Sequence, residues 1–282
     1  MPSVEKARAC ATSRRYNSAV PAPRRIAHLF APEHRALALA LLVVGGVWLF
    51  AALAFAALHG DSRALDEAAL RALRDPRAPG HLRGPAWLAS TARDVTALGS
   101  NAVLVPLLLA SAGFLLLLRK KVMALAVLAS GGGAIALQGP LKQLFARPRP
   151  QLVPRLVPAW NPSFPSGHAL LSSAIYLSIA VVVVRLIPYR RVRLYVLVLA
   201  ALLVALIGFS RVLLGVHYPT DVIGGWIVGG LWALLCGIGA RALQKVGAAE
   251  PPGLPPELTE DVSPLAPTSD PGASRGPAAP RR

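Results

Sequence analysis

The sequence predicts an all-α membrane protein, a bundle of six transmembrane helices with its active site at the outer membrane edge. Of its 282 residues, 54% are hydrophobic and 15% are charged. That balance is unusual for a soluble domain and typical of repeated apolar spans. Six apolar runs are long enough, singly, to cross or nearly cross a hydrocarbon core of about 30 Å at about 1.5 Å per residue. Polar residues gather in a few loops between these runs.

The chain begins with a basic segment, residues 1–35, that contains seven Lys and Arg residues. We expect it to be a cytoplasmic tail. Residues 36–58 form the first apolar run, and Ala54-Phe55-Ala56 at its end resembles a signal-peptide cleavage site. The run is longer than the roughly 7–15 apolar residues of a signal peptide, so a retained membrane anchor is the preferred interpretation.

Residues 59–96 form a polar segment with several acidic and basic side chains. Four apolar residues in it recur at helical spacing: Leu65, Ala69, Leu70 and Leu73. The spacing predicts a short amphipathic helix that lies against the membrane surface. A solvated helix within a loop is an equally good interpretation of the same pattern.

The remaining five spans are predicted at 97–118, 122–141, 169–187, 194–209 and 222–243. Basic turns join the second span to the third and the fourth to the fifth. Residues 246–282 contain nine prolines and no long apolar run, a composition that cannot bury a core. The sequence therefore predicts a six-span domain over 36–244 and a disordered cytoplasmic tail over 245–282.

The Lys and Arg residues predict the orientation of the spans in the plasma membrane. Nineteen of the 30 fall in the two tails and the two basic turns, which six spans place on one side. Because positive charge favours the cytoplasmic side, we expect both termini in the cytoplasm and the other loops outside. The basic residues form no continuous stripe and accompany no nucleic-acid motif, so no nucleic-acid partner is expected.

Three short motifs carry the chemistry of the chain. They are Lys142-x6-Arg149-Pro150, Pro165-Ser166-Gly167-His168, and Ser210-Arg211-x5-His217-x3-Asp221. Two predicted spans lie between the second motif and the third, so the chain crosses the membrane and returns. The motifs then end on the same face, where two loops can build one site.

The residue types in these motifs suit a phosphate group. Lys142, Arg149 and Arg211 offer positive charge and hydrogen-bond donors to phosphate oxygens. Asp221 is the only acidic residue between Val95 and Ala249, so the region cannot supply the carboxylates of a two-metal phosphatase. We therefore expect no metal ion and no cofactor. The two cysteines, Cys10 and Cys236, offer neither a disulfide framework nor metal-ligand spacing.

Two helix starts are predicted to organise the site. Ser166 occupies a favourable N-cap position, which leaves the N–H groups of Gly167 and His168 free to bind an anion. Pro219 is tolerated in a first helical turn, so His217 lies just before a helix and Asp221 lies in its first turn. Asp221 can then accept one imidazole N–H, favour the helix N-terminus, or do both.

The three motifs together resemble the signature of the type 2 phosphatidic acid phosphatase superfamily, with eleven matching positions in order. The resemblance extends over about residues 36–244. It implies that His217 is the nucleophile and forms a phosphohistidine, that Asp221 holds its imidazole, and that His168 is the general acid and then the general base. It also implies a phosphate-binding set: Lys142, Arg149, Ser166, Gly167 and Arg211.

The resemblance implies a membrane lipid phosphate as substrate, such as phosphatidic acid, phosphatidylglycerol phosphate or undecaprenyl diphosphate. A lipid phosphotransferase and a non-enzymatic lipid-phosphate binder or transporter are the alternative functions. Vanadate-dependent haloperoxidases share the signature, but six spans favour a membrane substrate. No motif requires Arg147 or Arg155, although either side chain can reach a substrate. The sequence leaves the oligomeric state unknown.

Overall fold

The computed structural model describes residues 32–245, so the predicted tails, 1–35 and 245–282, lie almost wholly outside the described residues. The chain divides into two units, Met1–Gly46 and Val47–Arg282. The first half of helix α1 (Pro32–His59) belongs to the first unit, and its second half belongs to the second unit. All contacts described below lie within the second unit.

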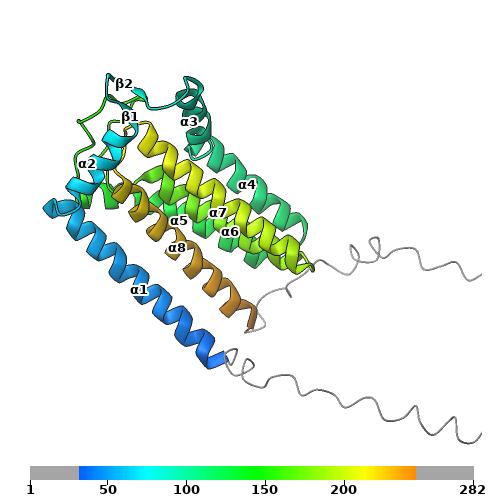
Figure 1. Cartoon of the computed structure of the whole chain (residues 1–282). Helices are drawn as coiled ribbons and strands as arrows, with labels where there is room; N and C mark the ends of the chain where they lie inside the picture. Colours follow the sequence, from blue (N-terminus) through cyan, green and yellow to red (C-terminus); the bar gives the residue numbers. More distant parts are fainter. Residues whose placement is uncertain (1–31, 246–282) are drawn as a thin grey trace, which may run out of the picture. The chain divides into compact units, whose positions relative to one another are not determined.

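The described part of the second unit is almost entirely helical, which confirms the predicted all-α class (Figure 1). After α1 the helices are α2 (Arg63–Ala72), α3 (Trp87–Ala97), α4 (Asn101–Leu117), α5 (Lys121–Phe145), α6 (Gly167–Leu186), α7 (Arg190–Leu213) and α8 (Pro219–Lys245). Two short strands, β1 (Arg74–Asp75) and β2 (Ala78–Leu82), pair antiparallel after α2 and were not predicted.

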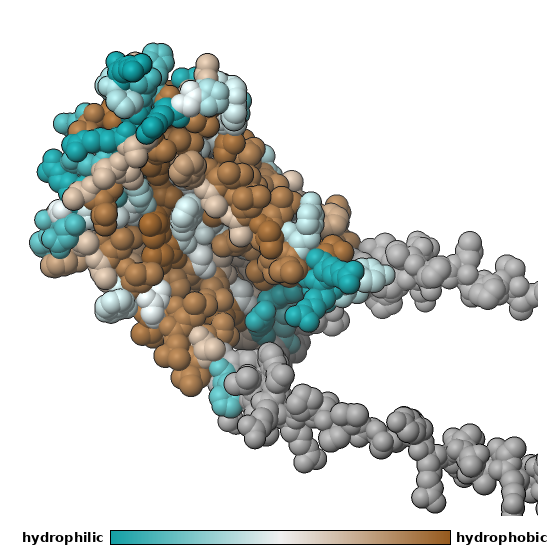
Figure 2. Space-filling model, in the orientation of Figure 1, coloured by the Kyte–Doolittle hydropathy of each residue, from teal (hydrophilic) through white to brown (hydrophobic). Residues whose placement is uncertain are grey.

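The helices are those of an integral membrane protein. Five of them, α1, α5, α6, α7 and α8, are long and apolar enough to span a bilayer, and the bent pair α3–α4 is a sixth candidate when it is taken as one span. Figure 2 shows hydrophobic residues covering the sides of the helices and hydrophilic residues gathered towards their ends. Large exposed apolar side chains such as Leu125, Leu199 and Phe209 lie on these sides, where lipid replaces water as the solvent.

Helix α6 lies at the centre and contacts α4, α5, α7 and α8. Its approach to α8 depends on small residues, because a Cβ atom at Gly229 would collide with the carbonyl of Leu170. At Gly225 a Cβ would lie 2.6 Å from the carbonyl oxygen of Ser166. Glycines let helix backbones pack closely within a membrane, where van der Waals contact holds helices together. The tight packing fixes the start of α6 beside the start of α8.

The predicted second span is bent rather than straight. Helices α3 and α4 meet at an angle of 41°, and the break falls at residues 98–100. A Cβ atom at Gly99 would lie 2.5 Å from Ile207 on α7 and 3.2 Å from the His168 ring on α6. The break therefore brings backbone close to both helices. Because nothing in the hydropathy of this run signals that contact, the sequence predicted a single helix from residue 97.

Helix α2 exists, and part of its predicted apolar set packs on the protein. Its buried face carries Ser62, Asp66 and Leu70, which are spaced four residues apart, whereas Leu65 is 78% exposed. Leu70 packs in a cluster with Val153 and Val222, and Leu73 packs against the same cluster. Helix α2 therefore docks on the protein through part of its predicted apolar side.

The loop between α5 and α6 is held by an aromatic cluster. Phe164 is fully buried and lies against Phe50 of α1 and Phe145 of α5, with ring centroids 5.7 and 5.1 Å away. Aromatic pairs at these separations stabilise packing beyond their buried area. The cluster fixes both ends of a segment that carries two of the three motifs.

Candidate active site

The structure brings the three motifs together at one end of α5, α6 and α7. A cavity of about 300 Å³ is lined by six of the eight predicted site residues, namely Lys142, Arg149, Gly167, His168, Arg211 and His217. Trp160, Gln138 and Asn101 complete much of the wall. The other two predicted residues, Ser166 and Asp221, are fully buried and do not line the cavity. The two polar loops therefore meet at one cavity, as the even number of spans between them predicted.

The two ring nitrogens of His217 have different partners. Nδ1 lies 3.3 Å from Oδ2 of Asp221, and Nε2 lies 3.1 Å from Nη1 of Arg149. An arginine can only donate, so Nε2 is the acceptor and Nδ1 carries the proton that Asp221 accepts. The lone pair of Nε2 is therefore held on the side of the phosphate-binding cations.

His217 is neutral in this environment. Burial lowers its pKa well below the ordinary value, and the positive charges of Arg149, Arg211 and Lys142 lower it further. A neutral imidazole with one nitrogen held by a carboxylate is the arrangement that makes histidine a nucleophile. The geometry therefore suits Nε2 for attack on an electrophilic phosphorus.

Asp221 is fixed by the start of α8. Pro219 occupies the first helical position, and Oδ2 of Asp221 accepts the backbone N–H of Tyr218 at 2.9 Å. This is the half of a capping box in which the third helical residue reaches back to the N-cap. The same carboxylate therefore caps its helix and contacts His217, so both roles considered for Asp221 coincide.

The predicted phosphate-binding cations are held by backbone and hydroxyl oxygens. Lys142, in the last turn of α5, donates to the carbonyl of Pro162 at 3.0 Å. Arg149 donates through Nε to Asn161 O at 2.6 Å and through Nη1 to Val216 O at 2.7 Å. Because burial lowers the pKa of Arg149, its guanidinium favours a ligand that brings negative charge into the cavity.

One hydrogen-bond donor of Arg211, its Nε, is unused by the described residues. Its Nη1 donates to Oγ1 of Thr96 on α3 at 3.0 Å, whereas its buried Nε has no hydrogen-bond partner among the described residues. An unpartnered buried donor is costly unless a ligand satisfies it. Thr96 had not been singled out from the sequence, because its segment joins the site only through the packing of α3 on α7.

Ser166 stands at the predicted N-cap of α6, but its side chain does not cap the helix. Its buried Oγ has no hydrogen-bond partner among the described residues, and its backbone N–H donates to Asp221 O at 2.9 Å. Gly167 borders the cavity, and a Cβ atom there would lie 2.5 Å from Oε1 of Gln138. The first N–H groups of α6 have no intrahelical acceptor, which suits anion binding.

An ion-paired group behind His217 was missed by reasoning from the sequence. Nη1 of Arg147 donates to Oδ1 of Asp221 at 2.6 Å, and its Nη2 donates to Oδ2 of Asp66 at 2.9 Å. The three side chains are 7%, 0% and 1% exposed, respectively. Burial alone would lower the pKa of Arg147, but the two carboxylates outweigh it and raise the pKa. The sequence signal that could have predicted a buried Asp66 is its spacing of four residues from Leu70, which places both on one face of the helix.

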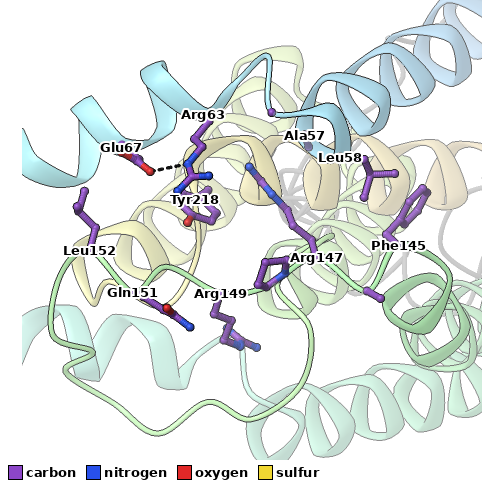
Figure 3. A pocket seen from close by; sticks show the side chains of 13 residues that line it. Ala57, Leu58, Arg63, Glu67, Phe145, Arg147, Arg149, Gln151, Leu152 and Tyr218 are labelled. Carbon is purple, nitrogen blue, oxygen red and sulfur yellow. Dashed lines mark hydrogen bonds and ion pairs between the residues drawn. The ribbon is translucent and has the colours of Figure 1, made fainter.

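A larger pocket of about 700 Å³ lies on the other side of the segment that carries Arg147. Figure 3 shows Arg147 and the Arg63–Glu67 ion pair of α2 near the Tyr218 ring. Of the predicted site residues only Arg149 borders this pocket. The chemistry therefore assigns the site to the smaller cavity, which holds both histidines and all three predicted cations.

Among residues 32–245, no three or more His, Cys, Asp or Glu side chains are grouped as ligands for a metal ion. Arg155 lies outside the smaller cavity and donates to the carbonyls of Pro150 and Ala159 within its own loop. It therefore shapes a loop at the rim of the site and does not reach into the cavity.

Comparison with known proteins agrees with this geometry. A family model described as the PAP2 superfamily matches residues 122–243. Phosphatidylglycerophosphatase B of Bacillus subtilis (strain 168) is 33% identical over 185 residues, which cover 65% of this chain and 87% of that protein. An undecaprenyl-diphosphatase of Sulfolobus acidocaldarius is 39% identical over 67 residues, which cover 24% of this chain and 28% of that protein.

The fold has a solved counterpart. The crystal structure of a transmembrane PAP2 type phosphatidylglycerolphosphate phosphatase from Bacillus subtilis matches with a TM-score of 0.65 and 30% sequence identity. The match covers 72% of this chain and 98% of that structure. With its helices, its motifs and these relatives taken together, the chain belongs to the PAP2 superfamily and is an integral membrane lipid phosphatase of that family.

Proposed function

We propose that the chain removes the terminal phosphate of a membrane lipid through a phosphohistidine at Nε2 of His217. One observation carries the proposal: Nε2 is an unprotonated acceptor at a cavity that also holds Lys142, Arg149 and Arg211, while Nδ1 is held by Asp221. The phosphohistidine intermediate is general for the family. The positions of these side chains in the cavity support the residue roles proposed below.

In the first step Nε2 of His217 attacks phosphorus, and the bond from phosphorus to the lipid oxygen breaks. His168, on the facing loop of the same cavity, protonates the departing oxygen. The proton on Nδ1 stays in the hydrogen bond to Asp221, which offsets the positive charge that the ring gains. The lipid leaves as an alcohol or, from a diphosphate, as a monophosphate.

In the second step a water molecule attacks the phosphohistidine. His168 takes a proton from the water, the phosphorus–nitrogen bond breaks, and inorganic phosphate and neutral His217 are restored. Lys142, Arg149 and Arg211, with the amide of Gly167, stabilise charge on the equatorial oxygens. The unpartnered Nε of Arg211, a residue that borders the cavity, is the group that a bound phosphate would satisfy, whereas Ser166 does not border the cavity.

For the substrate we propose a glycerol-based lipid phosphate of the phosphatidylglycerol phosphate type. A phosphatidylglycerophosphatase matches 65% of this chain, and the shorter match to an undecaprenyl-diphosphatase, over 24% of the chain, makes a prenyl diphosphate the second choice. A cavity of about 300 Å³ has room for a phosphorylated head group but not for acyl chains. The tails would therefore remain in the bilayer.

A phosphate-release panel tests the proposal. Purified protein in mixed micelles is given phosphatidylglycerol phosphate, phosphatidic acid, undecaprenyl diphosphate and short-chain soluble analogues. We expect specificity constants for the preferred lipid that exceed those of soluble analogues by at least about 100-fold, since partition of the tails into the micelle, at about 0.8 kcal/mol per CH₂, concentrates the lipid beside the site. Equal values for lipids and soluble analogues would contradict a lipid substrate. Phosphate transfer to added alcohols without release to water would favour the phosphotransferase.

Metal independence is part of the proposal and has a separate test. Activity is expected to survive dialysis against EDTA, because three cations supply the positive charge that metal ions provide in other phosphatases. Vanadate is expected to inhibit by occupying the same cradle as a phosphate mimic. A chemical step that stops in EDTA and is restored by a divalent ion would overturn this part.

We also propose that both termini lie in the cytoplasm and that the site opens outward, because most Lys and Arg residues then lie inside. Single cysteines at two exposed positions, Gln151 and Arg191, in a variant lacking Cys10 and Cys236, test the orientation. An impermeant thiol reagent added to intact cells should label position 151 and spare position 191. The reverse pattern would place the site on the cytoplasmic side.

A further inference from the structure

We infer that Asp66 and Arg147 are positioning residues for the reaction at His217 and act through Asp221. The inference rests on the proposed phosphohistidine chemistry, and it extends the site to helix α2. Neither side chain lines the catalytic cavity, so neither is placed to touch the phosphate. Both are almost completely buried on the far side of Asp221.

The first step of the argument concerns the orientation of the Asp221 carboxylate. Oδ2 faces Nδ1 of His217, so the imidazole is aimed correctly only if the carboxylate cannot rotate. Arg147 holds the other oxygen, Oδ1, through a short charge-assisted hydrogen bond of 2.6 Å. With both oxygens occupied, Asp221 keeps one rotamer and His217 keeps one tautomer.

The second step concerns what holds Arg147. Its guanidinium uses separate nitrogens for Asp221 and Asp66, and its Cζ lies 4.4 Å from the centroid of the Tyr218 ring. A planar fork can bridge two carboxylates in this way, whereas the ammonium group of lysine is a single point of charge. Asp66 is therefore the anchor that sets the plane of the guanidinium.

The third step links Asp66 to the start of α8. Its carboxylate accepts the backbone N–H of Thr220 at 3.1 Å and the Thr220 hydroxyl at 2.6 Å, and Ser62 donates to it at 3.0 Å. A carboxylate near the first N–H groups of a helix stabilises that helix end. Asp66 thus caps, from another helix, the turn in which Asp221 lies.

The charges of this group suit the proposed reaction. Two buried carboxylates share one arginine, so the group carries a net negative charge next to His217. The imidazole gains positive charge as Nε2 attacks phosphorus, and a fixed negative charge behind it stabilises that change. Full activity therefore requires that α2 docks on the protein, because α2 carries Asp66.

The experiment compares four variants in detergent micelles with the best lipid from the phosphate-release panel. Asp66→Asn, Arg147→Met and Arg147→Lys alter the group, and Glu67→Gln is the matched control. Glu67 neighbours Asp66 on α2, but its ion pairs with Arg63 and Arg71 are exposed. Thermal unfolding, kcat, KM and vanadate inhibition are measured for each protein.

For Asp66→Asn and Arg147→Met we expect kcat to fall by roughly 100-fold, the cost of a catalytic group displaced by about 1 Å. KM and the inhibition constant of vanadate should change by less than about threefold, because the phosphate cradle is intact. The kcat of Arg147→Lys should be about tenfold higher than that of Arg147→Met, since lysine keeps the positive charge but cannot donate to two carboxylates as a planar guanidinium does. Glu67→Gln should match the wild type.

Wild-type kcat in Asp66→Asn and Arg147→Met would overturn the inference. So would losses in vanadate binding or in folded protein that equal the loss in kcat, because these are the marks of a purely structural role. If Arg147→Met does not fold, Asp66→Asn decides, since it keeps the size of the side chain. A wild-type protein inactive on every lipid phosphate would instead contradict the proposed function.

Discussion

The two ends of helices α6 and α7 use the same basic residue types in opposite ways. At the site end, Lys142, Arg147 and Arg211 are each at most 7% exposed, and each donates to an oxygen inside the protein. At the other end, about 30 Å away along the 20 residues of α6 at about 1.5 Å per residue, Arg190 and Arg191 are exposed.

The difference shows that, among the arginines at the two ends of α6 and α7, burial and not number distinguishes the functional end. An exposed arginine at a membrane edge keeps its hydration and costs little. A buried cation loses several kcal/mol of hydration, and the loss is offset only by well-placed partners. At the site end the partners are mostly neutral carbonyl and hydroxyl oxygens, with Asp66 and Asp221 the carboxylates in contact. This leaves positive charge for a phosphate to neutralise.

The largest effect is expected for His217→Ala. Removing the nucleophile should lower kcat by at least about 1000-fold, as loss of a covalent catalytic residue does in other hydrolases. Phosphate release from the preferred lipid measures it, and His81→Ala, at an exposed position on β2, is the matched control. Substantial hydrolysis by His217→Ala in folded protein would contradict its assignment as the nucleophile.

The next effect sets one buried arginine against one exposed arginine. Arg211→Met should reduce kcat/KM by about 100- to 1000-fold, the usual cost of losing one group that stabilises transition-state charge. Arg191→Met should leave kcat/KM unchanged within about twofold, because surface positions contribute little. Steady-state kinetics on both proteins provide the measurement. Equal losses of kcat/KM in the two variants would show that burial of an arginine does not predict its contribution to catalysis.

A smaller effect concerns pH. Burial and the neighbouring cations hold the pKa of His217 well below its ordinary value, so the ring stays neutral as pH falls towards about 6.5. Activity that depends on neutral His217 is therefore lost only as pH falls through the lowered pKa.

Arg149→Met removes one positive neighbour of His217 and should let its pKa rise towards the ordinary value. The acid limb of kcat/KM against pH should then move to higher pH than in the wild type. Comparing the two profiles on one substrate cancels the titration of the substrate phosphate. An unmoved limb, or a shift to lower pH, would contradict the proposed effect of Arg149 on His217.

The smallest effect is expected at the far end. Replacing Arg190, Arg191 and Arg193 together by Gln should change the free energy of unfolding by less than about 0.5 kcal/mol per site and leave kcat unchanged. These residues are exposed, and the side chain of Arg193 donates to the carbonyl of Ile187. Thermal unfolding and phosphate release check this expectation. A loss of phosphate release as large as that of Arg211→Met would contradict the proposed difference between the two ends.

Much of the fold and of the candidate site could be predicted from the sequence, because both depend on short-range patterns. The apolar runs predicted the spans, since an α-helix of about 20 apolar residues is the simplest structure that crosses a bilayer. The parity of two spans predicted that Arg149 and His217 would meet on one face, and they lie 3.1 Å apart, Nη1 to Nε2. The types and spacing of the motif residues predicted an anion cradle with two histidines.

Only the tertiary structure showed which residues outside the motifs contact and support the motif residues. Asp66 lies 154 residues before Thr220 in the chain, yet its carboxylate caps the turn that carries Asp221. Hydropathy and helical spacing describe contacts within a helix, whereas this contact depends on how α2 docks beside α8, which the apolar pattern of α2 does not specify. The bend at Gly99 and the bond from Arg211 to Thr96 have the same origin in packing between helices. Local sequence determined the reacting groups, and long-range packing determined what holds them in place.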